Sequence, residues 1–151
     1  MEIREIHRDE YTISTDKNKL DVLSIHNFLA KETDWANGIP INTLKTSIEN
    51  SLNFGLYCEN KQIGFARIIS DYSTIAYLGD VYILKEYRGK GLSKWLIKEI
   101  MEHPNLQGLR RWILLTNTAE WLYKKFEFRE LSNPEFYMEK HNSNVYSEEK
   151  N

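Results

Sequence analysis

The stretch from residue 75 to residue 103 most constrains the fold of this chain, because it reads as a buried strand, a glycine loop and a helix in direct succession. Residues 75–84 are mostly apolar, and the apolar residues after position 91 recur at helical spacing. The loop between them, residues 88–93, reads Arg-Gly-Lys-Gly-Leu-Ser. Glycines let the backbone approach an anion closely, and the free amides and dipole at a helix start favour negative charge. The stretch therefore predicts a phosphate-binding site where the helix begins.

Four cations surround the two glycines of this loop, at Lys85, Arg88, Lys90 and Lys94. They could form an ordinary solvated surface, but their concentration at a helix start favours a role in holding an anion. The loop lacks the Gly-x-x-x-x-Gly-Lys-Ser/Thr spacing of a nucleotide-binding P-loop, so the sequence disfavours that class of protein.

Composition bounds the class of protein. The chain has 151 residues, of which 41% are hydrophobic and 13% aromatic, as in one globular domain. Its formal net charge of −2 gives no general attraction for nucleic acid. No apolar run is long enough to span a bilayer, no signal-peptide core is evident, and Cys58 has no second cysteine to pair with. We therefore expect a cytoplasmic protein with neither a nucleic-acid nor a membrane partner.

The order of predicted elements indicates an α/β protein. Residues 1–10 read as a weakly ordered charged leader, 11–140 as a single domain and 141–151 as a polar tail. Within the domain we predict strands and helices in mixed order, with a sheet covered by helices on both faces. The predicted strands are 11–15, 54–59, 62–70, 75–84, 111–116, 128–131 and 136–139, and the predicted helices begin near residues 16, 42, 92 and 119.

This order, together with the loop Arg88-Gly89-Lys90-Gly91-Leu92-Ser93, resembles the GNAT superfamily of acyl-CoA-dependent N-acyltransferases, whose loop reads Arg/Gln-x-x-Gly-x-Gly/Ala. A second segment, residues 116–128, resembles the family's later region, in which an Asn after a strand is followed by a Leu/Phe-Tyr-x-x-x-Gly-Phe run. The resemblance implies a GNAT-type mixed, mostly antiparallel sheet of six to seven strands, flanked by about four helices on both faces.

Two residues depart from the family pattern. Ser93 replaces the usual Gly/Ala, a small change that should still fit beside a pyrophosphate. Glu127 replaces the usual Gly, which commonly ends a helix in the left-handed conformation. If that geometry is kept, Glu127 should cost about 1 kcal/mol.

The resemblance also implies acetyl-CoA as co-substrate and no metal. The backbone of the preceding strand, near Val81, Tyr82 and Ile83, would pair with the pantetheine arm. Asn117 would contact the CoA arm, and Tyr123 would lie near the thioester sulfur. The loop residues that would hold the pyrophosphate are Arg88, Gly89, Lys90, Gly91, Leu92 and Ser93. The four histidines, at positions 7, 26, 103 and 141, show no metal-ligand spacing.

Two residues are candidates for proton transfer. Tyr123 is the candidate general acid, because a phenol stays protonated at neutral pH and can donate to a leaving thiolate. It also shares a helical face with other apolar residues, so a plain core role stays open. Asp80, an acid within an apolar strand, is the candidate base, because burial would raise its pKa. A structural carboxylate and a water chain are the alternatives.

Residues that could receive the acceptor are Trp35, Asp71, Tyr72 and Tyr77. Aromatic rings attract ammonium groups, and in the resembled family the loop around Trp35 covers the acceptor site. Asp71 could bind a cationic substrate or simply be a turn residue.

The resulting hypothesis is an N-acetyltransferase that moves an acetyl group from acetyl-CoA to an amine of a small molecule or peptide, by direct attack in a ternary complex. The alternative is a non-catalytic acyl-CoA-binding or sensor module on the same fold. The sequence leaves the acceptor amine open, and it leaves open whether the protein forms a homodimer.

Overall fold

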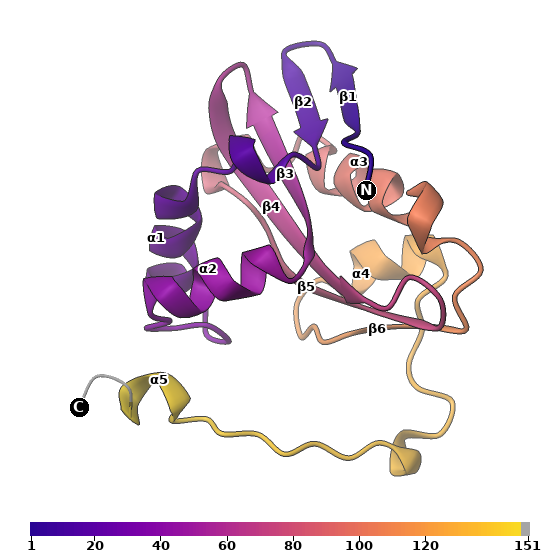
Figure 1. The fold of residues 1–151 in the computed structure, drawn as a ribbon. Coiled ribbons are helices and arrows are strands. Elements are labelled where there is room, and N and C mark those ends of the chain that lie inside the picture. Colours follow the sequence, from indigo (N-terminus) through magenta and orange to yellow (C-terminus); the bar gives the residue numbers. More distant parts are fainter. Residues whose placement is uncertain (149–151) are drawn as a thin grey trace.

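A single six-stranded sheet organises the computed structural model, which describes residues 1–148. The strands follow their order in the chain, and every neighbouring pair is antiparallel except the last, which is parallel (Figure 1). They are β1 (Glu5–Arg8), β2 (Tyr11–Ser14), β3 (Leu52–Cys58), β4 (Lys61–Ser70), β5 (Ile75–Ile83) and β6 (Arg111–Leu114). The predicted α/β class and the mostly antiparallel sheet are confirmed.

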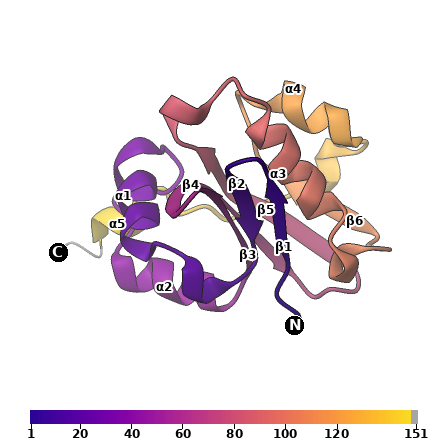
Figure 2. The ribbon, with the colours of Figure 1, turned by 90° about the horizontal axis from the view of Figure 1, so that it is seen from above.

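Helices cover both faces of this sheet, as expected. α1 (Val22–Glu32) and α2 (Ile41–Glu49) lie on one face, whereas α3 (Leu92–Met101) and α4 (Glu120–Tyr123) lie on the other (Figure 2). A short α5 (Val145–Glu148) lies near the C-terminus. Among the described residues, no helix combines the length and the apolar character needed to span a bilayer.

Two hydrophobic cores hold these layers together, because alternate residues of a strand point to opposite faces. Phe65 and Tyr82 pack with α1 and α2, and Tyr82 stacks on Phe28 with ring centroids 3.9 Å apart. On the opposite face, Ala66 and Ile83 pack with α3 and α4. Each strand of the central hairpin is therefore fixed from both sides.

The N-terminal region differs from the sequence prediction at two points. Residues 1–10 were expected to be a weakly ordered leader, but Glu5–Arg8 forms β1, whose Ile6 packs against the core beside α3. Asp16 was expected to start the first long helix, but it caps only the 3₁₀ turn Lys17–Lys19. Asp21 caps α1 instead, because its carboxylate accepts a bond from the Ser24 amide.

The two predicted closing strands, 128–131 and 136–139, are wrong for this chain. Both segments lie outside the sheet, and Phe136 belongs to the 3₁₀ turn Pro134–Phe136. A strand needs a neighbour for its N–H and C=O groups, and neither segment has one among residues 1–148. The predicted polar tail extends to residue 151, and its last three residues lie outside the described part.

Glu127 keeps the geometry that the family's glycine commonly adopts. Its φ of 69° and ψ of 10° are left-handed, and its amide closes the turn on the Lys124 carbonyl at 3.3 Å. A residue with a Cβ is strained in this region, so the conformation of Glu127 destabilises the folded state by about 1 kcal/mol.

We therefore expect Glu127→Gly to raise the free energy of unfolding by about 1 kcal/mol, because glycine removes the strain of the positive φ. Urea denaturation measures this change. Glu130→Gly is the matched control, because Glu130 is exposed and has no positive φ. The control should lose a few tenths of a kcal/mol through unfolded-chain entropy. A loss of stability in Glu127→Gly equal to that of the control would contradict the strain.

Candidate active site

The site begins where β5 separates from β6. The two strands pair only from Ile75 to Leu78 on one side and from Arg111 to Leu114 on the other. β5 continues to Ile83, so residues 79–83 have no strand on their β6 side. We call this side the open edge of β5. The sequence could predict the strand but not this separation.

A bulge disturbs the other side of the same segment. The pairing of β4 with β5 shifts register between Phe65 and Arg67, and neither Asp80 nor Val81 has a paired residue in β4. Farther along, the Leu84 amide donates to the Ile63 carbonyl at 2.8 Å. Since alternate residues direct their backbone groups to opposite sides, Tyr82 faces β4 and Ile83 faces the open edge. Val81 therefore presents its backbone groups at the open edge, and Ile83 presents its N–H, because its carbonyl accepts a bond from Arg88 Nε. Tyr82 instead packs its ring into the core.

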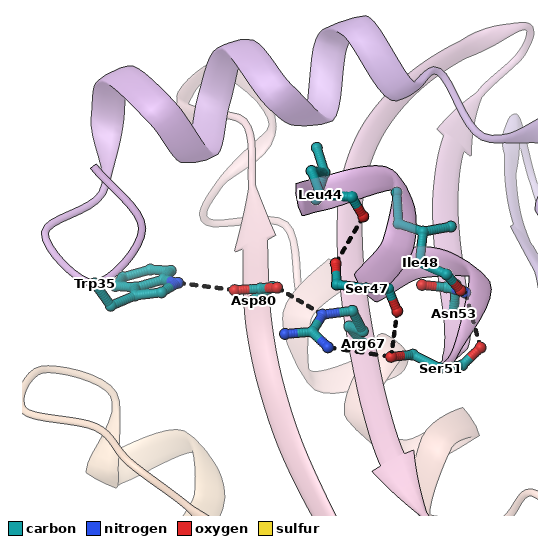
Figure 3. A network of polar contacts seen from close by, with 8 residues as sticks. All are labelled: Trp35, Leu44, Ser47, Ile48, Ser51, Asn53, Arg67 and Asp80. Atoms are coloured by element: carbon teal, nitrogen blue, oxygen red, sulfur yellow. Dashed lines mark hydrogen bonds and ion pairs between the residues drawn. The ribbon is translucent and has the colours of Figure 1, made fainter. Parts of the chain in front are cut away.

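Asp80 occupies the bulge with a φ of 52°. Its two carboxylate oxygens accept bonds from different elements: Oδ2 from Arg67 Nε at 2.8 Å, and Oδ1 from Trp35 Nε1 at 3.0 Å. The sequence suggested a lone carboxyl among apolar residues, but both oxygens are engaged (Figure 3). Arg67, which sequence reasoning missed, was visible as a cation within an otherwise apolar strand.

The same guanidinium ties this site to α2. Arg67 Nη1 donates to Ser51 Oγ at 3.1 Å, and the Ser51 hydroxyl donates to the Ser47 carbonyl at 2.6 Å (Figure 3). The Arg67–Asp80 pair is mostly buried, so breaking it would leave a poorly solvated charge. Asp80 is thus held rigidly between the α1–α2 loop and β4.

Tyr77 lies next to this group. A Cβ at Gly79 would come within 3.0 Å of the Tyr77 ring, so the ring covers Gly79. Burial raises the pKa of the Tyr77 hydroxyl, and the negative charge of Asp80 raises it further. The structure therefore brings together Trp35, Tyr77 and Asp80, three of the residues predicted from sequence.

Asp71 and Tyr72 lie elsewhere, in the turn between β4 and β5. Asp71 accepts bonds from the amides of residues 73, 74 and 75 and from the Thr74 hydroxyl, which hold its pKa well below the usual range. The turn is about five strand residues, or roughly 16 Å, from Asp80. Asp71 therefore serves as a turn residue. The distance from Asp80 gives no support to the prediction that Asp71 and Tyr72 contact the substrate.

The predicted strand, loop and helix are confirmed at the other end of the open edge. Gly89 and Gly91 have φ of 78° and 77°, and a Cβ at either would meet nothing within 4 Å. Glycine is thus favoured here by backbone conformation rather than by lack of space. Gly91 begins α3 without a side-chain cap, so the amides of its first turn have no partner within the helix. Such amides are suited to an anion.

The cations of the loop have different positions. Arg88 Nε donates to the Ile83 carbonyl at 2.8 Å and so fastens the loop to the end of β5. Lys90 lies 5.5 Å from the centre of the Tyr87 ring, and Lys61 lies 5.6 Å from it. Lys61 comes from the β3–β4 turn, so only the fold reveals that it adds charge here.

Tyr123 lies in α4, and it is only 7% exposed. Its ring meets Phe128 edge-on at 5.9 Å, and burial raises the pKa of its hydroxyl to about 12. It also lines a groove of about 300 Å³ that follows β6. We call this the β6 groove; its lining includes Trp112, Leu114, Thr116, Tyr123, Phe128 and Leu131. Asn117 is exposed on the loop between β6 and α4. Tyr123 is thus both a core residue and part of a groove wall.

The comparisons with known proteins agree on one family. Residues 49–130 match the model of the acetyltransferase (GNAT) domain. A protein of Gibberella zeae named as a proposed acetyltransferase is 34% identical, with 78% of each chain covered. A crystal structure from Xanthomonas campestris pv. campestris, of a protein assigned to the GNAT family, is 45% identical, with a TM-score of 0.89 over 91% of this chain and 96% of that one.

A more distant structure was determined with acetyl-CoA. It is an acetyltransferase of inferred activity from Clostridium acetobutylicum, 14% identical, with a TM-score of 0.61 over 87% of this chain and 94% of that one. At this identity the likeness shows the fold alone.

Proposed function

The chain belongs to the GNAT acetyltransferase family and is an acyltransferase, and on this basis we propose that it moves an acetyl group from acetyl-CoA to an amine of a small molecule or peptide. The amine would attack the thioester directly in a ternary complex. The observation that carries the proposal is the open edge of β5, which leads into a glycine loop and the uncapped start of α3.

These features fit an elongated ligand with phosphates at one end. The amides at the start of α3, with Lys90 and Lys61 nearby, would hold the pyrophosphate. The Val81 carbonyl and the Ile83 N–H, which have no strand partner at the bulge and the open edge, would pair with the pantetheine arm. The bound thioester would supply the activated acetyl group.

The open edge also suits the developing negative charge. An amide that is already fixed by the strand can donate to an oxyanion without reorganising. Val81 is the candidate donor, because the bulge leaves it without a partner in β4.

Tyr123 would protonate the leaving thiolate. Its pKa of about 12 keeps the phenol protonated at neutral pH, so it can donate there. Its place on the wall of the β6 groove, rather than fully inside the core, supports access to a bound ligand.

Asp80, Trp35 and Tyr77 would receive the acceptor. A carboxylate flanked by two aromatic rings attracts an ammonium group. Asp80 stays the candidate base, with a water chain as the alternative, because Arg67 and Trp35 already bind its oxygens. The pH dependence of turnover in Asp80→Asn separates the two. If the fall in turnover at low pH disappears, Asp80 is the base that takes the proton from the amine. If the fall persists, water takes that proton.

Gly91→Ala should weaken acetyl-CoA binding by about tenfold, because alanine strains the positive φ at the start of α3 and lets the free loop relax away. Isothermal titration calorimetry measures the affinity. Gly108→Ala is the matched control, because Gly108 has a φ of 73° and equally open surroundings but lies outside the loop. Equal affinities for the two variants, or no binding by the unaltered protein at millimolar ligand, would contradict the site.

Tyr123→Phe should lower turnover at least 100-fold, because the general acid is lost, while the affinity for acetyl-CoA stays within about twofold. Thiol release with a panel of amines measures turnover. Tyr57→Phe is the control: Tyr57 is also buried, and its hydroxyl has no partner within the described chain. If Tyr123→Phe turned over as fast as Tyr57→Phe, Tyr123 would not be the general acid. Binding of acetyl-CoA without turnover by the unaltered protein would favour the acyl-CoA-binding module instead.

A further inference from the structure

α1 and α2 cover only part of their face of the sheet. Their apolar side chains pack over Phe65 and Tyr82, in the half of β4 and β5 nearest the glycine loop. Beyond the bulge the same two strands carry Ile69 and Ile75, which are 47% and 38% exposed. Large apolar side chains that stay open to water next to a candidate site indicate a surface that contacts another molecule.

The neighbours of these residues show which face they occupy. The core beneath α3 takes alternate residues of the two strands, namely Ala66, Ile68, Ala76 and Leu78. Because successive side chains of a strand point to opposite faces, the residues between them point to the α2 side. Arg67 confirms this direction, since its guanidinium meets Ser51 just after α2.

The pairing of the strands places three of these side chains in a row. Tyr77 in β5 lies opposite Ile69 in β4 and opposite Ile113 in β6. Paired residues share a face, so the row crosses three strands over about 10 Å. We call Ile69, Ile75, Tyr77 and Ile113 the apolar patch. None of the four belongs to either hydrophobic core of the described chain.

The apolar patch continues directly into the polar group around Asp80. The ring of Tyr77 extends over Gly79, the residue before Asp80. On the other side Trp35 donates to the Asp80 carboxylate and is still 60% exposed (Figure 3). A carboxylate, two aromatic rings and an apolar surface therefore follow one another along the same face.

The charge of this surface is small. Arg67 donates to the Asp80 carboxylate at 2.8 Å and compensates its charge. Arg111, which lies beside Ile75, adds a further cation. The other acid of the α1–α2 loop, Asp34, is exposed, so water and salt screen its charge. The surface can thus attract one ammonium group at Asp80, but it has no set of carboxylates for several.

We propose that the acceptor is a monoamine with an apolar or aromatic body, whose ammonium group meets Asp80 while its body lies on the apolar patch. The inference rests on the proposed function and narrows its substrate class. In the reaction the ammonium would lose a proton, its nitrogen would form the C–N bond of the amide, and the C–S bond would break to release CoA as a thiol.

Other occupants fit this surface less well. A polyamine or an aminoglycoside would bring further charges that find no carboxylate, and it would leave the apolar patch in contact with water. A second copy of the chain, or its own exposed C-terminal segment, could cover the apolar side chains. Neither would explain why the patch ends at a carboxylate between two aromatic rings.

NMR of the isoleucine methyl groups tests binding, with phenethylamine as the probe because it joins one ammonium group to one ring. We expect the Ile69 and Ile113 methyl groups to shift saturably at millimolar amine, with or without CoA bound. Ile3 is the control, because it is 54% exposed but precedes β1, at the other edge of the sheet. Ile69 and Ile113 signals that stay unshifted in both states would overturn the proposal, including the case in which the chain itself covers the patch.

Thiol release with three amines tests the specificity. We expect kcat/KM for phenethylamine to exceed that for ethanolamine and for spermidine at least about tenfold, because only phenethylamine buries an apolar body. Ile69→Ser should narrow this preference about threefold, because it removes part of the apolar surface. Ile3→Ser, a matched change of an exposed isoleucine, should keep the preference.

Failure of this inference and failure of the proposed reaction give different results. Phenethylamine that shifts the patch while no amine releases thiol would contradict the reaction and leave the binding site standing. Ethanolamine or spermidine with an equal or higher kcat/KM would overturn the inference and leave the reaction standing. A preference that Ile69→Ser changes no more than Ile3→Ser would also overturn the inference.

Discussion

The separation of β5 from β6 after Leu78 is the constraint on which the whole site depends. It leaves backbone groups of a central strand without a strand partner, which a fold tolerates only where solvent or a ligand can satisfy them. The bulge next to it holds Asp80 at a φ of 52°, a conformation that costs about 1 kcal/mol for a residue with a Cβ. The bonds from Arg67 and Trp35 offset that cost and keep the bulge in one geometry.

This constraint links distant parts of the chain. Arg67 connects the bulge to α2 through Ser51, and Trp35 brings the α1–α2 loop to the open edge. At its other end the same strand leads to the glycine loop, which Arg88 fastens to Ile83. One strand thus carries the polar group around Asp80 and leads to the glycine loop.

The sequence predicted those parts of the site whose conformation depends only on residues that are neighbours in the chain. The glycine loop could be predicted because a positive φ strongly favours glycine. The strain at Glu127 could be predicted for the same reason, because Glu127 stands where the family pattern has glycine. The hydrogen-bond partners of Asp80 could not be predicted from the sequence, because Arg67 and Trp35 come close to Asp80 only when the strands pair with the bulge in place. The predicted strand at residues 136–139 was wrong, because an aromatic-rich pattern cannot show whether any strand of the sheet will pair with it. Asp16 and Asp21 are equally good caps by residue type, and in the structure Asp16 caps the 3₁₀ turn and Asp21 caps α1.

Amide NMR during titration with acetyl-CoA shows whether the ligand lies along the open edge of β5, because it reports on the backbone groups of that edge. We expect the resonances of the Val81 and Ile83 amides to shift, and these amides to exchange with solvent more slowly, on binding, together with the amides at the start of α3. The amide of Gly108, outside the loop, should stay unchanged. Saturable binding that leaves Val81 and Ile83 unaffected would contradict the claim that the open edge holds the ligand.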